Sequence, residues 1–100
     1  MTKWADYGIS AVKFRDDNVY ILSVKVHEDK GESIGNAFEV RREDIVSSIK
    51  SGKTFCTILR KDNKWSKGED VGIVAINNKE FIRTDKNQTE RDNLSELPEF

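Results

Sequence analysis

The side chains with chemical potential in this sequence are few. Cys56 is the only cysteine and His27 the only histidine. A nucleophilic thiol needs a histidine or a cation beside it, and the sequence supplies none next to Cys56, so we expect a small buried hydrophobic residue there. His27 continues the face of Ser23 and Lys25 on a predicted strand, so we expect an exposed histidine. No spacing of metal ligands occurs, and we predict no metal and no cofactor.

Catalysis is the least supported class of function. The sequence has no glycine-rich phosphate loop, and the adjacent carboxylates of Asp16 and Asp17 fall in a predicted turn, where solvation explains them. We therefore expect a protein that is not an enzyme.

The most suggestive local arrangement is Trp65 between Lys64 and Lys67, in a segment, 61–70, that we expect to be a loop. An aromatic ring flanked by cations can stack on a base while the cations bind phosphate. Alternatively, the indole folds back over one end of a small barrel. Arg83, at the end of a predicted strand, is of a residue type enriched at interfaces. We therefore predict a candidate binding surface that consists of Arg60, Lys61, Lys64, Trp65, Lys67 and Arg83.

Charge is unevenly distributed along the chain. Residues 41–67 hold eight basic and three acidic side chains, whereas residues 68–100 hold four and eight. The basic segment either forms a patch for phosphate or is neutralised by the acidic flanks, which is the interpretation we favour. The net charge of −1 argues against a dedicated nucleic-acid binder. The basic side chains in question are Arg41, Arg42, Lys50, Lys53, Arg60, Lys61, Lys64 and Lys67.

The clearest structural element is a hairpin within residues 64–84, which we place at the centre of the fold. Asn77 and Asn78 tolerate the positive φ of a two-residue turn between two apolar runs. This turn pairs Ile76 with Lys79, Val74 with Phe81 and Gly72 with Arg83. At Gly72 either the Arg83 guanidinium lies across the bare backbone, or the glycine marks a bulge or bend, which is the more ordinary explanation.

A second hairpin is predicted from Tyr7–Arg15 and Val19–Val26. A turn at Asp16 and Asp17 would set Val12 against Ile21, Ile9 against Val24 and Tyr7 against Val26, with apolar residues opposite one another on both faces. After a charged turn at 27–32, a third strand is expected over 33–40. Its free edge offers a place for self-pairing.

One helix is predicted, over Glu43–Ser51. Ile45, Val46 and Ile49 form its apolar stripe, acids occupy its first turn, and Gly52 suits the left-handed position that ends a helix. Arg42 is a poor N-cap. A fourth strand follows over 54–60, with alternate residues on opposite faces. After Thr84 the chain is polar, with Asp92 or Asn93 available to cap a single helical turn.

These elements define one domain, 1–100, with a polar tail, 85–100, that is closed by Leu94, Leu97 and Phe100. We expect the two leucines to pin the tail to the body and Phe100 to lie near the surface. We expect an α+β fold of about six mostly antiparallel strands, curled into a partly open barrel or strongly bent sheet, with one short helix packed on it. The apolar runs are too short to cross a membrane, and the N-terminal segment lacks the apolar core of an export signal. With a single cysteine, a cytoplasmic location is expected.

The chain resembles a family of small bacterial and archaeal proteins of about this length that is known only as a domain of unknown function. The resemblance covers nearly the whole chain and implies no activity, cofactor or partner. It rests on the segments MTKWADY at 1–7, ISAV at 9–12, GKTF at 52–55, KWSKGEDV at 64–71, FIRTD at 81–85, DNL at 92–94 and LPEF at 97–100.

We therefore expect a small non-catalytic module that binds a protein or peptide on a surface including Trp65 and Arg83. The alternative is nucleic-acid binding through the basic segment, 41–67, with Trp65 as the stacking platform. A monomer or a weak homodimer fits either function.

Overall fold

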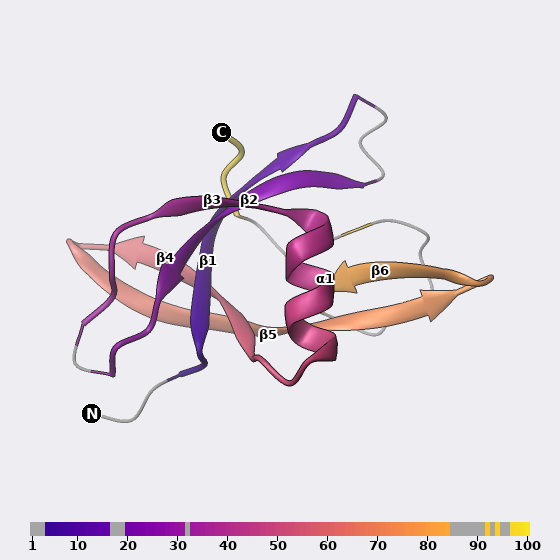
Figure 1. Cartoon of the computed structure of the whole chain (residues 1–100). Helices are drawn as coiled ribbons and strands as arrows, with labels where there is room; N and C mark the ends of the chain where they lie inside the picture. Colours follow the sequence, from indigo (N-terminus) through magenta and orange to yellow (C-terminus); the bar gives the residue numbers. More distant parts are fainter. Residues whose placement is uncertain (1–3, 17–19, 32, 85–91, 93, 95–96) are drawn as a thin grey trace.

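The structure is a computed structural model that describes residues 4–16, 20–31, 33–84, 92, 94 and 97–100, with the backbone alone at Lys61. It contains six strands and one helix, which confirms the expected α+β class (Figure 1). In chain order the elements are β1 (Tyr7–Phe14), β2 (Ile21–Glu28), β3 (Phe38–Arg41), α1 (Arg42–Lys50), β4 (Phe55–Lys61), β5 (Lys64–Ile76) and β6 (Lys79–Arg83).

The strands form one mixed, open sheet in the order β3-β2-β1-β4-β5-β6. Four of the neighbouring pairs are antiparallel, and the β1–β4 pair is parallel. The parallel pair arises because α1 carries the chain from the β3 edge past β2 and β1. The middle of the sheet is therefore β1 and β4, so our placement of the 64–84 hairpin at the centre was wrong.

The register of the β5–β6 hairpin is as predicted. Ile76 pairs with Lys79, Val74 with Phe81 and Gly72 with Arg83. Asn77 and Asn78 both have positive φ, 51° and 67°, as a primed turn requires. Val71 is the last residue of β5 paired with β4, and Gly72 is the first paired with β6. No described atom lies within 4 Å of where a Gly72 side chain would start, so the guanidinium of Arg83 does not cover it.

The predicted loop over 61–70 was wrong, because β4 and β5 form a hairpin there. Asp62 and Asn63 adopt positive φ, 53° and 64°, and make the turn. Gly68 lies so close to β4 that a Cβ would be 2.1 Å from Thr57 Oγ1, and the Thr57 hydroxyl also accepts a hydrogen bond from Glu69 N (2.8 Å). This close approach holds a polar stretch in strand conformation despite its weak β-propensity.

The predicted register of the first hairpin was also wrong. Ile9 pairs with Val26 and Val12 with Val24, so β2 is displaced by two or three residues. Arg15 N donates to Tyr20 O (2.9 Å), which closes the hairpin with a connection longer than two residues. Apolar residues face Ile9 and Val12 in both registers, so the apolar pattern alone did not distinguish the two.

The third strand is shorter than expected, Phe38–Arg41 in place of 33–40. Ile34 forms only an isolated bridge with Asp29, and Gly35 N donates to Glu28 O (2.9 Å). The segment before Phe38 is thus held to the end of β2 without regular pairing.

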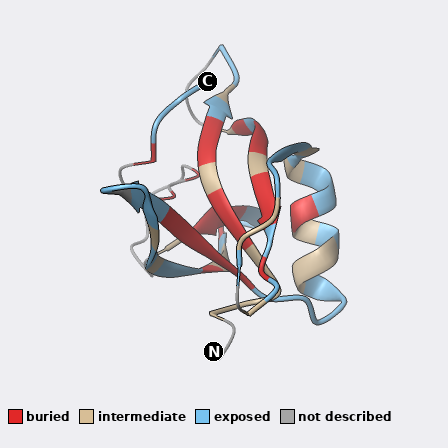
Figure 2. Cartoon of the chain, turned by 90° about the vertical axis from the view of Figure 1, so that its left-hand side faces the viewer, coloured by how far each residue is buried: buried red, intermediate tan, exposed pale blue. Residues whose placement is uncertain are grey.

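The helix agrees with the prediction to within one residue at each end. Arg41 precedes it without a side-chain capping bond, and Gly52 has φ +103° after its last turn. Ile45 is the buried residue of α1, while Val46 and Ile49 pack against the core. Figure 2 shows α1 beside the sheet. The helix therefore covers one face of the sheet with its predicted stripe.

The core is closed by the C-terminal residues. Leu94 and Leu97 are buried in the main apolar cluster, as expected of a pinned tail. Val12 N donates to Pro98 O (2.9 Å) and Phe100 N donates to Val12 O (3.0 Å), so the tail continues the sheet beside β1. The predicted helical turn, capped by Asp92 or Asn93, falls on positions that lie outside the described residues, apart from Asp92 and Leu94 themselves. The Asp92 carboxylate accepts hydrogen bonds from β2, α1 and β6.

Candidate functional site

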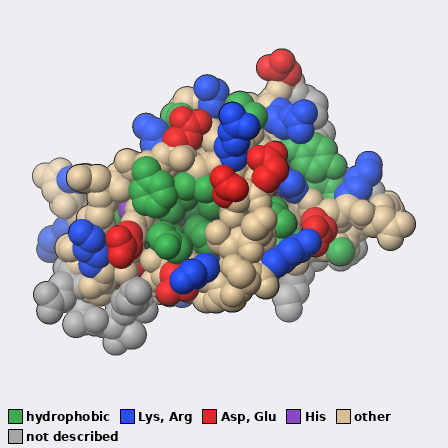
Figure 3. All heavy atoms as spheres, in the orientation of Figure 1, with side chains coloured by type: hydrophobic (Ala, Val, Ile, Leu, Met, Phe, Trp, Pro, Cys, Tyr) green, Lys and Arg blue, Asp and Glu red, His purple; other side chains and the backbone are tan. Residues whose placement is uncertain are grey.

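A cavity of about 160 Å³ lies between α1 and the sheet. Apolar side chains gather on this face of the molecule (Figure 3). The lining comes from five elements and from the residue positions just before β4, and comprises Tyr7, Val26, Phe38, Val40, Ile45, Ser48, Lys53 and Phe55.

Cross-strand pairing aims the β3 side chains into this cavity. Phe38 pairs with Val26, and Val40 with Val24, so Phe38 and Val40 share the face that α1 covers. The ring of Tyr7 stacks on the ring of Phe55 with centroids 5.2 Å apart, which gives the cavity an aromatic wall. Ile45 and Ser48 face it from consecutive turns of α1.

The cavity opens beside an exposed aromatic side chain. Phe38 is 47% exposed, the largest exposed fraction among the big hydrophobic residues that the structure describes. It lies on β3, which among the described strands pairs only with β2 and so forms one edge of the sheet. An apolar wall, an exposed ring and an unpaired strand edge thus occur together.

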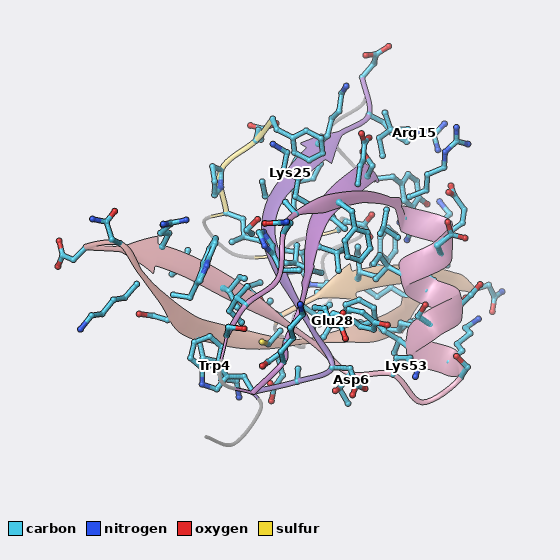
Figure 4. All side chains as sticks on the ribbon, turned by 60° about the vertical axis from the view of Figure 1, so that its left-hand side comes forward. Trp4, Asp6, Arg15, Lys25, Glu28 and Lys53 are labelled. Atoms are coloured by element: carbon cyan, nitrogen blue, oxygen red, sulfur yellow. The ribbon has the colours of Figure 1, made fainter. Side chains whose placement is uncertain are left out.

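Among the described residues that line the cavity, Lys53 is the one with a charged side chain. Lys53 N donates to Ser48 O (3.0 Å), and the next residue, Thr54, is held by Asp6 through a 2.9 Å bond from Thr54 N to the carboxylate. Figure 4 shows Lys53 and Asp6 at the same end of α1. In the described part of the chain, no carboxylate lies within salt-bridge distance of the Lys53 ammonium.

The residues of the predicted binding surface do not all come together. The Arg60 guanidinium lies 5.5 Å from the centre of the Trp65 ring, and Lys64 and Lys67 follow on the same β4–β5 hairpin. Trp65 is half-buried, and Arg83 is only 3% exposed. The expected surface shared by Trp65 and Arg83 is therefore not formed. The Lys61 side chain lies outside the described residues.

Acidic residues from 68–100 neutralise part of the basic segment, as the sequence suggested. The carboxylate of Asp92 lies 2.6 Å from Arg42, Glu80 lies 2.7 Å from Lys50, and Asp70 lies 3.1 Å from Lys67. Three of the eight basic side chains are thereby paired within the chain.

His27 is buried, at 6% exposure, so the prediction of an exposed histidine was wrong. Trp65 explains the difference, because its ring centre lies 5.0 Å from that of His27. The Gly35 carbonyl, 2.8 Å from Nδ1, can only accept, so Nδ1 carries the proton. Nε2 then accepts from the Ser10 hydroxyl, 2.7 Å away. Such a pair polarises a serine hydroxyl, but here Trp65 packs over the ring.

Cys56 is fully buried, as predicted. Burial raises the pKa of its thiol, and Asp70 and Asp29 raise it further while Lys67 opposes them. The thiol therefore stays protonated near neutral pH and is a poor nucleophile.

Two further findings concern the described residues only. No group of three or more His, Cys, Asp or Glu side chains is arranged to hold a metal ion. In that same part of the chain, α1 is far too short and too polar to cross a bilayer.

Sequence reasoning missed the cavity. It predicted the strand that contains Phe38 and Val40 and the helix stripe that contains Ile45, but the space between them depends on how α1 crosses the sheet. The one available signal was Phe38 itself, an aromatic residue in a strand expected to form an edge.

Comparison with known proteins gives a family but no activity. The model of the family described as "Protein of unknown function (DUF3892)" matches residues 8–98. No curated protein and no solved structure matches the chain. The chain belongs to this family of unknown function.

Proposed function

We propose that this member of a family without an assigned function is a non-catalytic module that binds a protein or peptide partner in the cavity between β3 and α1. The partner inserts one apolar side chain between Phe38, Val40 and Ile45. The observation that carries the proposal is the coincidence of this cavity with an exposed phenylalanine at a sheet edge.

The size of the cavity suits one side chain. An apolar cavity of roughly 150 Å³ is large enough for a benzene ring, and this cavity has about 160 Å³. A phenylalanine or leucine side chain therefore fits, whereas a second large group does not. Removing such a side chain from water stabilises the complex by roughly 1.5 to 3 kcal/mol before the losses of association are counted.

The free edge of β3 adds a second source of affinity. An extended partner segment laid along β3 can form main-chain hydrogen bonds and direct alternate side chains to the α1 face. Phe38 and Val40 already point to that face. A segment whose apolar residue enters the cavity thus continues the sheet by one strand.

The remaining chemistry favours binding over catalysis. The thiol of Cys56 is buried and protonated, and the imidazole of His27 lies beneath Trp65. The lone buried cysteine also suits a reducing compartment, and we propose a cytoplasmic location.

Nucleic-acid binding has weaker support. Arg60 and Trp65 lie together on the β4–β5 hairpin, which is the arrangement that a stacking site requires. However, Arg42, Lys50 and Lys67 are engaged by carboxylates, which reduces the charge available for phosphate.

The test is selection of peptides from a phage-displayed random library against the immobilised protein. We expect enriched peptides that share a large apolar residue and that lose at least about tenfold in affinity for the Phe38→Ser variant. Leu59→Ser is the matched control, because Leu59 is 45% exposed and does not line the cavity. Failure to enrich any peptide, or equal loss in both variants, would contradict the proposed function.

A further inference from the structure

We infer that the partner presents its own carboxyl terminus, with an aromatic or branched aliphatic last residue in the cavity and the α-carboxylate beside Lys53. This inference rests on the proposed function, and it names the chemistry of the group that the site recognises.

The charge at the cavity comes from Lys53. Of the eight described residues that line the cavity, seven are uncharged and the eighth is Lys53. Its ammonium has no carboxylate partner in the described part of the chain. Lys50, three residues earlier, is by contrast engaged by Glu80 at 2.7 Å. A cation at the edge of an apolar cavity attracts a ligand that combines an apolar group with a negative charge.

The backbone around Lys53 is held by hydrogen bonds. Gly52 turns the chain away from α1 through a φ of +103°, and Lys53 N donates to Ser48 O. Asp6 and Thr54 then hold the following residue through two reciprocal bonds, Asp6 N to Thr54 Oγ1 and Thr54 N to the Asp6 carboxylate, each 2.9 Å long. The backbone that carries the ammonium is thus fixed at both sides.

A chain terminus and an internal segment differ in the chemical group that each places at the cavity opening. The side chain and the α-carboxylate of a last residue leave the same Cα atom. When that side chain fills a cavity sized for one side chain, the carboxylate must lie at its opening. An internal residue presents a neutral amide in the same place, which gains much less from an ammonium. Ser48 also lines the cavity, and a serine hydroxyl can serve as a second donor for the carboxylate.

The remaining chain of the partner has a place beside β3. A terminal residue in the cavity leaves the preceding residues free to run along the edge of β3, which is the only described strand edge beside the cavity. Capture of a terminal carboxylate and addition of a strand then act together, each of them a recurrent mode of peptide recognition.

The experiment compares three probes by ¹⁵N amide-shift titration at low salt. They are an acetylated Gly-Thr-Ser-Thr-Phe pentapeptide with a free terminal carboxylate, the same peptide with a terminal amide, and 3-phenylpropionate. We expect the acid peptide to bind about two- to fivefold tighter than the amide, the size of a partly exposed ion pair. We also expect it to bind more tightly than 3-phenylpropionate, which cannot pair with β3.

Variants assign the preference to one side chain. Lys53→Met keeps the apolar stem and should abolish the preference for the acid, whereas Lys53→Arg should retain it. Lys79→Met is the matched control, because Lys79 is exposed on the β5–β6 hairpin and does not line the cavity. Added salt should narrow the gap between acid and amide.

The outcomes separate this inference from the proposed function. Equal affinity of acid and amide, with both lost in Phe38→Ser, would overturn the carboxylate preference and leave a peptide site. Binding of 3-phenylpropionate as tight as the peptide would overturn the choice of a chain terminus in favour of a free small acid. A preference that survives Lys53→Met would overturn the role of Lys53. Binding of no probe, together with a failed library selection, would overturn both proposals.

Discussion

The two ends of α1 carry cations with opposite environments. At its start, the Arg42 side chain is 16% exposed and its Nε donates to the Asp92 carboxylate at 2.6 Å. The same carboxylate accepts from Ile21 N (2.8 Å) and Ile82 N (2.9 Å), so it joins β2, β6 and α1. Beyond the other end, Lys53 borders the cavity with no acidic partner in the described chain. One cation is committed to the fold, and the other remains available.

From this difference we assign Arg42 a structural role, and we propose a binding role for Lys53. A fully buried carboxylate is tolerated because four donor groups from three elements satisfy it. An unpaired ammonium beside an apolar opening contributes little to stability, because water solvates it in the free protein. The structure therefore predicts that changes at the Arg42 end alter folding and that changes at the cavity alter binding.

The largest effect should follow from Asp92→Ala. It leaves Arg42 and two backbone amides without their acceptor, and we expect a loss of about 3 to 5 kcal/mol in the free energy of unfolding, measured by urea denaturation. The control is Glu80→Gln, which removes a surface pair with Lys50 and should cost no more than about 1 kcal/mol. Similar small losses for both variants would show that the Asp92 cluster is not a structural centre.

The next effect tests the second buried polar cluster. Ser10→Ala removes the donor to His27 Nε2, and we expect a loss of roughly 1 to 3 kcal/mol because a buried nitrogen is left unsatisfied. Ser47→Ala, at an exposed helix position, should be neutral. Peptide affinity at neutral pH should be unchanged by either substitution. A loss of binding without a loss of stability in Ser10→Ala would mean that this cluster, not the cavity, contacts the partner.

Phe38→Ser should show the reverse pattern. Because the ring is 47% exposed, we expect the free energy of unfolding to fall by less than about 1 kcal/mol while peptide affinity falls at least about tenfold. Urea denaturation and amide-shift titration of the same samples measure the two quantities. A large loss in the free energy of unfolding would show that Phe38 is a core residue. It would contradict the separation between a cluster at Arg42 that maintains the fold and a cavity that binds the partner.

The smallest effect concerns pH. Burial raises the pKa of Cys56 above its ordinary value of 9.0, so the unfolded chain releases this proton before the folded chain does. The free energy of unfolding should therefore be constant below that value and decline above it, by up to about 1.4 kcal/mol per pH unit. Cys56→Ala should remove the part of the decline that the Cys56 thiol causes and leave the part that other titrating groups cause. Reaction of the native thiol with Ellman's reagent at pH 8 as fast as in urea would contradict the assignment.

The elements that were predicted correctly are those determined by residues close together in the sequence. The β5–β6 register followed from Asn77 and Asn78, and the helix followed from its apolar stripe and Gly52. The Asp62 and Asn63 turn is of the same kind, but the polar residues after it obscured the strand. The strand after the turn is held by contact with Thr57 on β4. The β-propensity of its own residues does not include such a contact.

Long-range contacts account for the other differences. His27 is buried because Trp65, from a distant hairpin, packs on its ring. Asp92 binds Arg42 across 50 residues of sequence, and no local pattern indicates that pairing. The cavity is likewise a property of how α1 crosses the sheet. The sequence thus predicted a binding module with a free strand edge, and the place of binding that we propose depends on the tertiary structure.

The most direct test is an amide-shift titration of the wild-type protein with the tightest peptide from the library selection. The cavity account predicts the largest shifts at Val40, Ile45, Ser48 and Lys53, with loss of those shifts in Phe38→Ser and their retention in Leu59→Ser. Shifts that instead centre on Arg60, Lys64 and the Trp65 indole would contradict it and would place the binding site on the β4–β5 hairpin.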